Sequence, residues 1–167
     1  GEKRCKNKVI KYIPHGLDHK IFSPVNKFGE EYLKLKNSLE KDGKMDFKLL
    51  YNSRNIRRKS IPDTILAWKY FLDTLNKEKR DKCQLILHTT PVDEHGTDLP
   101  EVIRFLFPEE NHNVIISPGK FTTEQMSYLY NYADGTILLS SAEGWGLALT
   151  ESLLTGTPII ANVTGGM

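Results

Sequence analysis

The stretch TILLSSAEGWGLALTESLLTGTPIIANV, residues 136–163, decides the fold. It opens with a short apolar run, TILL, that predicts a buried strand, and it continues through a serine- and glycine-rich loop into a helix over residues 147–154. Gly156 predicts the end of that helix, and residues 158–163 (PIIANV) predict a second strand. A strand, a helix and a second strand in this order form a βαβ unit, in which the two strands lie parallel.

The same alternation of short apolar runs and amphipathic segments extends back to Asp46. Further strands are predicted at residues 47–51, 84–88 and 114–117, and further helices after Ser60, over residues 99–107 and after Thr122. Ser60 and Asp63 have the spacing of a capping box, and so have Thr122 and Gln125. The sequence therefore predicts an α/β fold, an open, doubly wound, mainly parallel Rossmann-like sheet of about five strands with helices on both faces.

Residues 1–45 fit this alternation less well. Within them, residues 8–13 (KVIKYI) predict a strand that runs into a Pro-His-Gly turn, and residues 30–41 predict a charged helix. We therefore expect residues 1–45 to form an interdomain crossover strand and turn followed by that helix. Residues 46–167 are expected to form one Rossmann-like domain.

The length of 167 residues suits one domain and not two. The sequence ends directly after a predicted strand, at Gly165-Gly166-Met167, with no helix left to cover that strand. We therefore expect the Rossmann-like domain to be truncated at its C-terminus.

The net charge of +2 hides an uneven distribution of charge. Residues 1–60 hold 16 basic and 7 acidic side chains, whereas residues 61–167 hold 7 and 14. A basic surface of this kind suits nucleic acid, a phosphorylated ligand, a membrane surface or an acidic partner.

Cys5 and Cys83 have the spacing of neither a disulfide framework nor a zinc site. No apolar stretch reaches the roughly 18 residues that cross a bilayer, so we expect a soluble, cytoplasmic protein without a transmembrane segment.

The loop at residues 140–147 (SSAEGWGL) links a predicted buried strand to a helix. In an open α/β sheet, ligands bind beyond the carboxyl ends of the strands, where this loop lies. Gly144 and Gly146 let the backbone approach a ligand closely, and the first N–H groups of the helix favour an anion. We therefore expect a phosphate here, with a tight turn used for packing alone as the alternative. The nicotinamide fingerprint is incomplete, and no Walker motif occurs.

Two glutamates, Glu143 and Glu151, belong to this loop and the helix that follows it. Eight residues of helix would separate them by about 12 Å, which is too far for an acid and base acting on one bond. We expect them to bind different parts of one extended ligand. The alternative for Glu151 is an exposed helix carboxylate.

Residues 52–59 (NSRNIRRK) follow the first predicted strand and so lie at the same edge of the sheet. An arginine fork matches phosphate geometry and a lysine supplies a mobile point charge, so Arg54 and Lys59 could neutralise a diphosphate held at the glycine loop. We expect Arg57 and Arg58 to form a solvated charge run.

Two other groups of polar residues suggest chemistry less strongly. The first contains potential metal ligands without a standard spacing, which a polar loop and a helix cap explain: His88, Asp93, Glu94, His95 and Asp98. The second, Ser140-Ser141, lacks the G-x-S-x-G context of a nucleophile elbow. Neither a metal site nor a hydrolase is therefore expected.

Taken in order, the motifs resemble the C-terminal, donor-binding domain of the retaining glycosyltransferases of family 4, which have two Rossmann-like domains (the GT-B fold). The resemblance rests on R-x(4)-K, E-x(7)-E and T-G-T-P-I-I-A, found here at Arg54 and Lys59, Glu143 and Glu151, and residues 155–161. Residues 13–18 (IPHGLD) are similar to the turn by which these enzymes cross between their domains. The chain departs from the usual pattern at His15, Ser53 and Trp145, where the family has Asn, Gly and Phe.

The resemblance implies a binding site for a nucleotide-sugar donor, with UDP-, GDP- and ADP-sugars all open. Arg54 and Lys59 would hold the donor diphosphate and stabilise it as the leaving group, and Glu143 would face the transferred sugar. Glu151 would contact the ribose. The backbone around the glycine loop would share the contacts to the diphosphate, through Gly144, Trp145, Gly146 and Leu147.

The loop at residues 118–121, which includes Gly119 and Lys120, would contact the base. No metal or other cofactor is expected, because fixed cations and N–H groups can stabilise the charge that builds on a departing nucleoside diphosphate. The implied partner is an acceptor-binding N-terminal domain that the sequence does not contain, so the chain alone is expected to be inactive.

Two other functions remain open at this point. A Rossmann-like module could bind a nucleotide or a partner at the same edge of the sheet without catalysis. A nucleic-acid-binding protein is disfavoured because the cations of the N-terminal third lack interleaved aromatic residues, so no nucleic-acid partner is expected.

Overall fold

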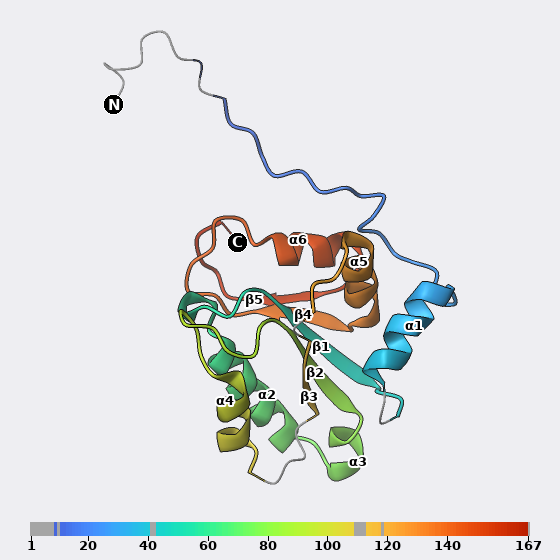
Figure 1. The fold of residues 1–167 in the computed structure, drawn as a ribbon, viewed down its shortest axis with the longest axis vertical. Coiled ribbons are helices and arrows are strands. Elements are labelled where there is room, and N and C mark those ends of the chain that lie inside the picture. The colour runs from blue at the N-terminus through green and yellow to red at the C-terminus, as the bar shows by residue number, and fades with distance from the viewer. Residues whose placement is uncertain (1–8, 10, 41–42, 109–112, 118, 167) are drawn as a thin grey trace.

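The computed structural model describes residues 9, 11–40, 43–108, 113–117 and 119–166. These residues contain a five-stranded sheet in the order β3-β2-β1-β4-β5, in which every neighbouring pair is parallel (Figure 1). The strands are β1 (Phe47–Asn52), β2 (Cys83–His88), β3 (Val114–Ile116), β4 (Gly135–Leu138) and β5 (Ile159–Ala161). The predicted α/β fold is confirmed, with strand ends that differ from the prediction by one or two residues.

Strand β1 lies at the centre of the sheet, with two strands on each side of it. Leu50 of β1 pairs with Ile86 of β2 on one side and with Thr136 of β4 on the other. From there β3 extends the sheet beyond β2, and β5 extends it beyond β4. The strand order therefore reverses between β1 and β4, and in open α/β sheets such a reversal leaves a crevice at the carboxyl ends of the two strands.

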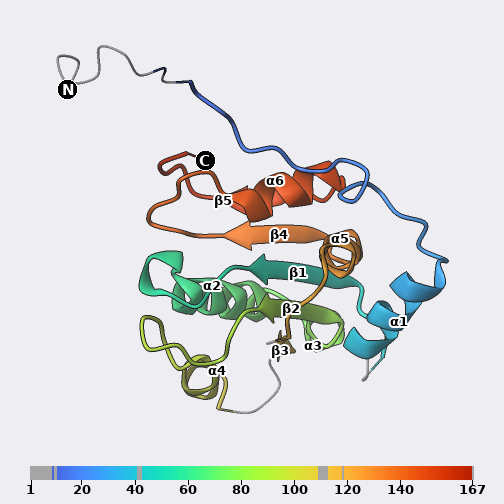
Figure 2. The ribbon, with the colours of Figure 1, turned by 45° about the horizontal axis from the view of Figure 1, so that its top comes forward.

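Helices cover both faces of the sheet. Figures 1 and 2 show α2 and α4 together on one face and α1, α5 and α6 on the other. Their bounds are α1 (Glu30–Leu39), α2 (Ile61–Asp73), α3 (Lys77–Arg80), α4 (Leu99–Leu106), α5 (Thr123–Tyr132) and α6 (Leu147–Leu154). The short helix α3 was not expected from the sequence; the side chain of Asn76 begins it by accepting a hydrogen bond from Lys79 N at 3.0 Å.

The core consists of one apolar cluster on each face of the sheet. Because successive residues of a strand point to opposite faces, Tyr51 packs in the cluster under α2 and Leu50 in the cluster under α5. The first cluster also contains Ile65 and Trp68, two members of the apolar stripe that predicted helix α2, and both are buried. The second contains Leu129 and other residues of the stripe on α5.

One of the two predicted capping boxes is confirmed and the other is wrong. Thr122 Oγ1 accepts from Gln125 N at 3.2 Å, and Gln125 Oε1 accepts from Thr122 N at 2.9 Å, so α5 begins as predicted. Ser60, by contrast, has a left-handed backbone (φ 47°) and its side chain does not cap α2. The reason is the 3-10 turn η2 (Arg57–Lys59), which ends directly before Ser60 and turns the chain sharply into the helix.

Helix α1 packs against α5 through the buried side chains of Tyr32 and Leu39. The Leu39 carbonyl accepts a hydrogen bond from Gln84 Nε2 at 3.1 Å, and Tyr132 donates to Glu40 Oε1 at 3.1 Å. The charged helix predicted near residues 30–41 is thus part of the same packed unit as the sheet. The division of the chain after residue 45 stays a prediction.

The strand predicted at residues 8–13 is wrong for the residues of that run that the structure describes. Val9, Tyr12 and Ile13 form neither strand nor helix, and their side chains are more than 80% exposed. Figure 1 shows this segment running away from the sheet, so it has no strand with which to pair. Among the described residues, no helix is long and apolar enough to cross a membrane.

Candidate functional site

The loops that follow β1 and β4 meet at the carboxyl edge of the sheet. The ammonium group of Lys59 forms an ion pair with Glu143 Oε1, across 84 residues of sequence. Both side chains are nearly buried, at 10% and 7% exposed. Arg58 Nη1 lies 3.3 Å from the same carboxylate oxygen and donates to the Ala142 carbonyl at 2.6 Å. The structure thus brings the predicted residues Lys59 and Glu143 together.

Arg58 corrects the prediction of a solvated charge run at Arg57 and Arg58. Both side chains are exposed, but that of Arg58 also contacts the loop after β4. The backbones of the two loops are also joined, because Ser141 N donates to the Arg58 carbonyl at 2.8 Å. Arg58 therefore belongs to the cluster that surrounds Glu143.

Glu143 is held in its charged form. Burial alone raises the pKa of this carboxyl group, but the hydrogen bond from Lys59 and the positive charges of Lys59 and Arg58 outweigh burial and lower the pKa below its ordinary value. Two cations around one carboxylate leave a net positive charge at this position. Such a charge favours an anionic ligand.

Helix α6 directs its N-terminus toward the same edge of the sheet. Its N-cap residue, Gly146, has a φ of 76°, a left-handed conformation that glycine adopts without strain. In the described part of the chain no side chain caps this end, but the Leu149 N–H already donates to the Gly146 carbonyl at 2.9 Å, which leaves the N–H groups of Leu147 and Ala148 for a ligand. Gly144, Trp145 and Leu147 adjoin Gly146 in this loop, as predicted, although ligand binding by their backbone stays a prediction.

A segment that we call the strap, residues 162–166, follows β5 and lies against the loop that carries Glu143. Asn162 Nδ2 donates to the Ser140 carbonyl at 2.8 Å, and Gly166 N donates to the Glu143 carbonyl at 3.0 Å. These bonds fix the backbone of Glu143 from the β5 side, opposite to the cations that hold its side chain.

The glycine pair of the strap is required by close packing. A Cβ atom at Gly165 would lie 2.2 Å from the Glu143 carbonyl oxygen, and one at Gly166 would lie 2.1 Å from the Gly144 carbonyl oxygen. Real Cβ atoms do not approach other atoms so closely, so any larger residue would push the strap away. The two glycines therefore let the strap pack against the backbone of the loop that carries Glu143.

Arg54, the other predicted cation, is paired with Asp93. Its Nε and Nη2 atoms lie 3.1 and 3.4 Å from the two carboxylate oxygens of Asp93. Asp93 is only 12% exposed, whereas Arg54 is 62% exposed. The hydrogen bonds from Arg54 and from the His95 backbone lower the pKa of Asp93, so its carboxylate is fixed and Arg54 is the exposed partner.

The loop that carries Asp93, residues 90–97, is also attached to the β1 loop by the backbone bond from Arg57 N to the His95 carbonyl and by the amide side chain of Asn55. Asn55 is 1% exposed, and its Oδ1 accepts from Thr97 N at 3.1 Å. Its Nδ2 donates to three backbone carbonyls, those of Thr90 (3.2 Å), Pro91 (3.4 Å) and Thr97 (2.6 Å). These partners fix which end of the amide is oxygen and which is nitrogen, because carbonyls only accept hydrogen bonds and an N–H group only donates them.

Glu151 takes part in a partly buried chain of hydrogen bonds. Asn52 Nδ2 donates to the Tyr130 hydroxyl at 2.7 Å, and that hydroxyl donates to Glu151 Oε2 at 2.7 Å. Burial raises the pKa of Glu151, and the hydrogen bond from Tyr130 offsets only part of this effect. The alternative for Glu151, an exposed helix carboxylate, is therefore wrong. Contact with a ribose stays a prediction.

Because burial raises the pKa of Glu151 in the folded state, the charged carboxylate costs stability. The folded state binds this proton more tightly than the unfolded state, so its contribution falls as the pH rises through the raised pKa. We expect Glu151→Gln, which keeps an acceptor for Tyr130, to raise the free energy of unfolding at pH 7 by up to about 1 kcal/mol, since solvent screens part of the cost. Urea unfolding between pH 4 and pH 7 measures this; a substituted chain that is less stable at every pH would contradict it.

The predicted base-binding loop lies at the other edge of the sheet, after β3. Gly119 and Lys120 are described and exposed, whereas residue 118 lies outside the described residues. Nearby, the His88 ring contacts Phe121 with centroids 4.6 Å apart, and burial lowers the pKa of His88. In strand order β3 is three places from β4, or about 14 Å, so a single ligand would have to be extended to reach both loops.

The potential metal ligands at residues 88–98 have structural contacts. Asp98 caps helix α4 by accepting from Glu101 N at 3.0 Å, and Asp93 holds Arg54. Within the described ranges, no three His, Cys, Asp or Glu residues are placed to bind one metal ion. Cys83 is a free, buried cysteine, and Cys5 lies outside the described residues.

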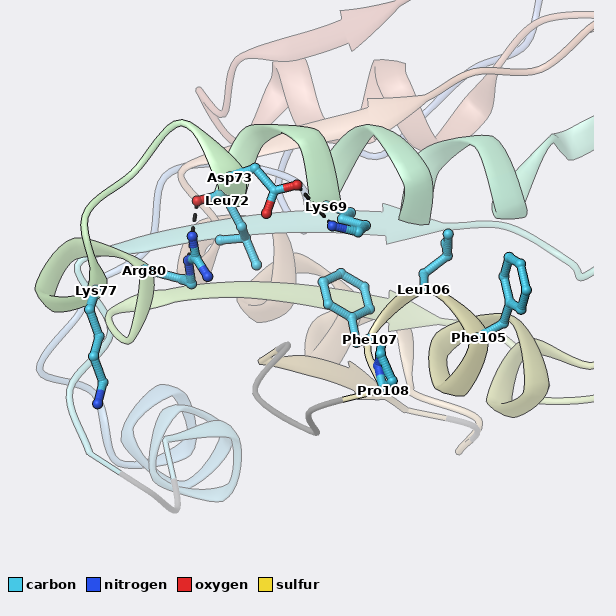
Figure 3. A pocket seen from close by; sticks show the side chains of 9 residues that line it. All are labelled: Lys69, Leu72, Asp73, Lys77, Arg80, Phe105, Leu106, Phe107 and Pro108. Carbon is cyan, nitrogen blue, oxygen red and sulfur yellow. Dashed lines mark hydrogen bonds and ion pairs between the residues drawn. The ribbon is translucent and has the colours of Figure 1, made fainter.

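A wide groove of about 900 Å³ lies away from this site, between the C-terminal ends of α2 and α4 and helix α3 (Figure 3). Two of its charged side chains have structural contacts: Lys69 pairs with Asp73 at 2.8 Å, and Arg80 Nε donates to the Leu72 carbonyl at 3.2 Å. Figure 3 shows Lys77 pointing away from the other lining side chains.

Sequence reasoning missed four residues of the site. They are Asn52, Asn55, Arg58 and Tyr130. Asn52 and Asn55 carried a usable signal, since polar residues directly after a buried central strand lie at the ligand edge of an α/β sheet. Tyr130 carried none, because its position in the apolar stripe of α5 predicts only burial.

Comparisons with solved structures agree with this fold. The C-terminal domain of the group 1 glycosyl transferase LpcC from Francisella tularensis superposes with a TM-score of 0.65 at 17% identity, over 87% of this chain and 70% of that one. Sucrose-phosphate synthase from Thermosynechococcus elongatus gives 0.66 at 27% identity, over 92% and 35%. Anabaena HepE, solved with UDP and glucose, gives 0.65 at 20% identity, over 90% and 37%.

The chain thus spans little more than a third of the length of the latter two proteins. Among curated proteins, none matches this sequence significantly. The family model for glycosyl transferases group 1 matches residues 36–167, which include every strand of the sheet and both loops of the site. The chain therefore belongs to the glycosyl transferases group 1 family.

Proposed function

We propose that this chain binds the nucleotide-sugar donor of a retaining, metal-independent glycosyl transfer. One observation carries the proposal: Lys59 and Arg58 surround the buried Glu143 carboxylate beside the uncapped N-terminus of α6. This arrangement has a surplus of positive charge and fixed N–H groups at the carboxyl edge of the sheet, where α/β proteins bind their ligands. Anabaena HepE, which shares the fold, was solved with UDP-glucose, which supports a donor of this class.

In the proposed reaction the bond between the anomeric carbon and the donor phosphate oxygen breaks, and the nucleoside diphosphate leaves with the bonding electrons. An acceptor hydroxyl forms the new bond to that carbon, and its proton passes to the departing phosphate. Negative charge builds on that diphosphate, and Arg54, Lys59 and the α6 N–H groups would stabilise it. Because these groups supply the positive charge, the proposed reaction needs no metal. Glu143 would accept hydrogen bonds from hydroxyl groups of the transferred sugar, and Glu151 would contact the ribose.

The acceptor is proposed to bind to a further domain that this sequence does not contain. The proposal is consistent with the share of the neighbouring structures that the chain spans, 35% of sucrose-phosphate synthase and 37% of HepE. Transfer by these 167 residues alone is expected to be negligible. The cytoplasmic location stays a prediction of the sequence.

Donor binding can be tested on the chain as it stands. We expect isothermal titration calorimetry to detect binding of at least one of UDP, GDP and ADP. Arg54→Ala is expected to weaken that binding about tenfold, the usual size of a lost charge-assisted contact to phosphate.

The matched control for this test is Arg104→Ala, which removes the same charge from an exposed ion pair with Glu101 on helix α4. It should leave the affinity within a factor of two. If none of the three diphosphates binds, or if the two substituted chains bind equally well, the proposed function is wrong.

A further inference from the structure

Arg58 occupies a position between the two loops of the site and has unused hydrogen-bond donors. Its side chain is 45% exposed. In the described part of the chain it contacts the Ala142 carbonyl and Glu143 Oε1, and both contacts go through Nη1. The Nε and Nη2 groups make no hydrogen bond with the described residues. A guanidinium group in this state can bind a further acceptor without losing the contacts it has.

Lys59, in comparison, is poorly placed to make the first contact with an anion. Its side chain is 10% exposed, and its ammonium group is engaged by Glu143, whose side chain is 7% exposed. The ammonium group has N–H donors besides the one that binds Glu143, but its nearly buried side chain gives an incoming anion less access than the Arg58 side chain does. The geometry therefore suits Lys59 to holding Glu143 in place.

Arg54 alone leaves the diphosphate with too little positive charge. The Asp93 carboxylate is fixed by backbone and side-chain hydrogen bonds and neutralises Arg54 in the unliganded chain. A nucleoside diphosphate carries at least two negative charges near pH 7. The two cations around Glu143 supply the surplus positive charge of the site, and Arg58 is the exposed one of the two.

We propose that Arg58 is a donor-binding residue, whose Nε and Nη2 groups bind the diphosphate together with Arg54 while Lys59 holds Glu143. This inference rests on the proposed function and changes its division of roles. The planar fork of arginine matches two phosphate oxygens, which a lysine at the same position could not do. Arg58 remains attached to the Ala142 carbonyl in the complex, so the ligand also links the loops after β1 and β4.

The competing explanation is that Arg58 only joins the two loops. The two roles differ in what they predict for a ligand without phosphate. A diphosphate-binding residue strengthens the binding of UDP and leaves the binding of uridine unchanged, whereas a structural link affects both ligands alike. The comparison of a nucleoside diphosphate with its nucleoside therefore separates them.

We test this by NMR titration of the unsubstituted chain, Arg58→Ala and Arg57→Ala with UDP and uridine, or with whichever diphosphate and nucleoside the chain prefers. Arg57→Ala is the matched control, because its side chain is exposed in the same 3-10 turn and carries the same charge. We expect Arg58→Ala to weaken diphosphate binding about tenfold and nucleoside binding less than twofold. Arg57→Ala should change both by less than twofold.

Equal diphosphate affinities of Arg58→Ala and Arg57→Ala would overturn the role of Arg58 and leave the proposed function standing, provided that Arg54→Ala still weakens binding. An equal loss for diphosphate and nucleoside would assign Arg58 to a structural link and overturn the inference as well. Failure of the unsubstituted chain to bind any diphosphate would remove the proposed function together with this inference. Should Arg58→Ala not fold, Arg58→Lys keeps the charge without the fork and is expected to show a smaller loss of the same kind.

Discussion

Replacing Lys59 with methionine is expected to lower the free energy of unfolding by about 3 kcal/mol at pH 7. Methionine keeps most of the buried aliphatic length of the side chain, so the loss reports on the charge. It leaves the nearly buried Glu143 carboxylate with Arg58 as its remaining cation at 3.3 Å, and breaking a buried ion pair from one side costs about 3–5 kcal/mol. Urea unfolding followed by circular dichroism measures the change.

The pH dependence of this loss follows from the pKa of Glu143. In the unsubstituted chain that pKa is lowered, so the ion pair contributes stability above the unfolded value and loses it as the pH falls through the folded value. In Lys59→Met we expect burial to raise the pKa relative to the unsubstituted chain, so the difference between the two chains shrinks toward low pH. A double substitution, Lys59→Met with Glu143→Gln, should recover more than 1 kcal/mol, because no unpaired charge remains. Equal stability of the single and double variants would show that the two side chains do not form a pair in solution.

The second large effect is expected at Asn55. Asn55→Asp has almost the same shape, but it turns the amide that donates to three carbonyls into a carboxylate oxygen that faces them. A buried charge with acceptors for neighbours is expected to cost about 4 kcal/mol at pH 7, a large share of the 5–15 kcal/mol typical of a domain. Thermal unfolding and hydrogen exchange of residues 90–97 measure the loss of stability and the release of the loop.

The pH dependence again has a definite sign. The pKa of the new carboxyl group should lie above its ordinary range, so the destabilisation grows as the pH rises through that pKa and is smaller at pH 4 than at pH 7. Asn76→Asp is the control, because it introduces the same charge at the N-cap of α3, where aspartate is as good as asparagine. A loss at Asn55 no larger than that at Asn76 would contradict the hydrogen-bond pattern of the loop.

Features that depend on neighbouring residues were predicted well from the sequence. The bounds of α6 follow from a buried apolar run that begins after two glycines, and the structure has the helix at residues 147–154 as predicted. Capping at Thr122 was also correct, since both partners lie within one turn. Capping at Ser60 was not, because the same spacing was preceded by a 3-10 turn that sets its backbone to the left-handed region.

Features that depend on distant residues could not be predicted in the same way. The resemblance placed Lys59 and Glu143 at one site, but the pairing of their side chains depends on the alignment of β1 with β4. The role of the Tyr130 hydroxyl required α5 and α6 to be docked, and the partner of Arg54 required the β2 loop to be in place. For the same reason the basic character of the first sixty residues gave no indication of which cations would carry a role.

Strand β1 lies between β2 and β4 in the sheet, but β4 is synthesised long after β1. Lys59 leaves the ribosome well before Glu143, which lies 84 residues later, and at typical rates of about 5–20 residues per second the delay is several seconds. During that time one long edge of β1 has no partner, because its neighbour β4 has not yet been made. Until β4 is made, β1 is an exposed edge strand that can pair with another chain, and its protection depends on the last fifth of these residues, which contain β4.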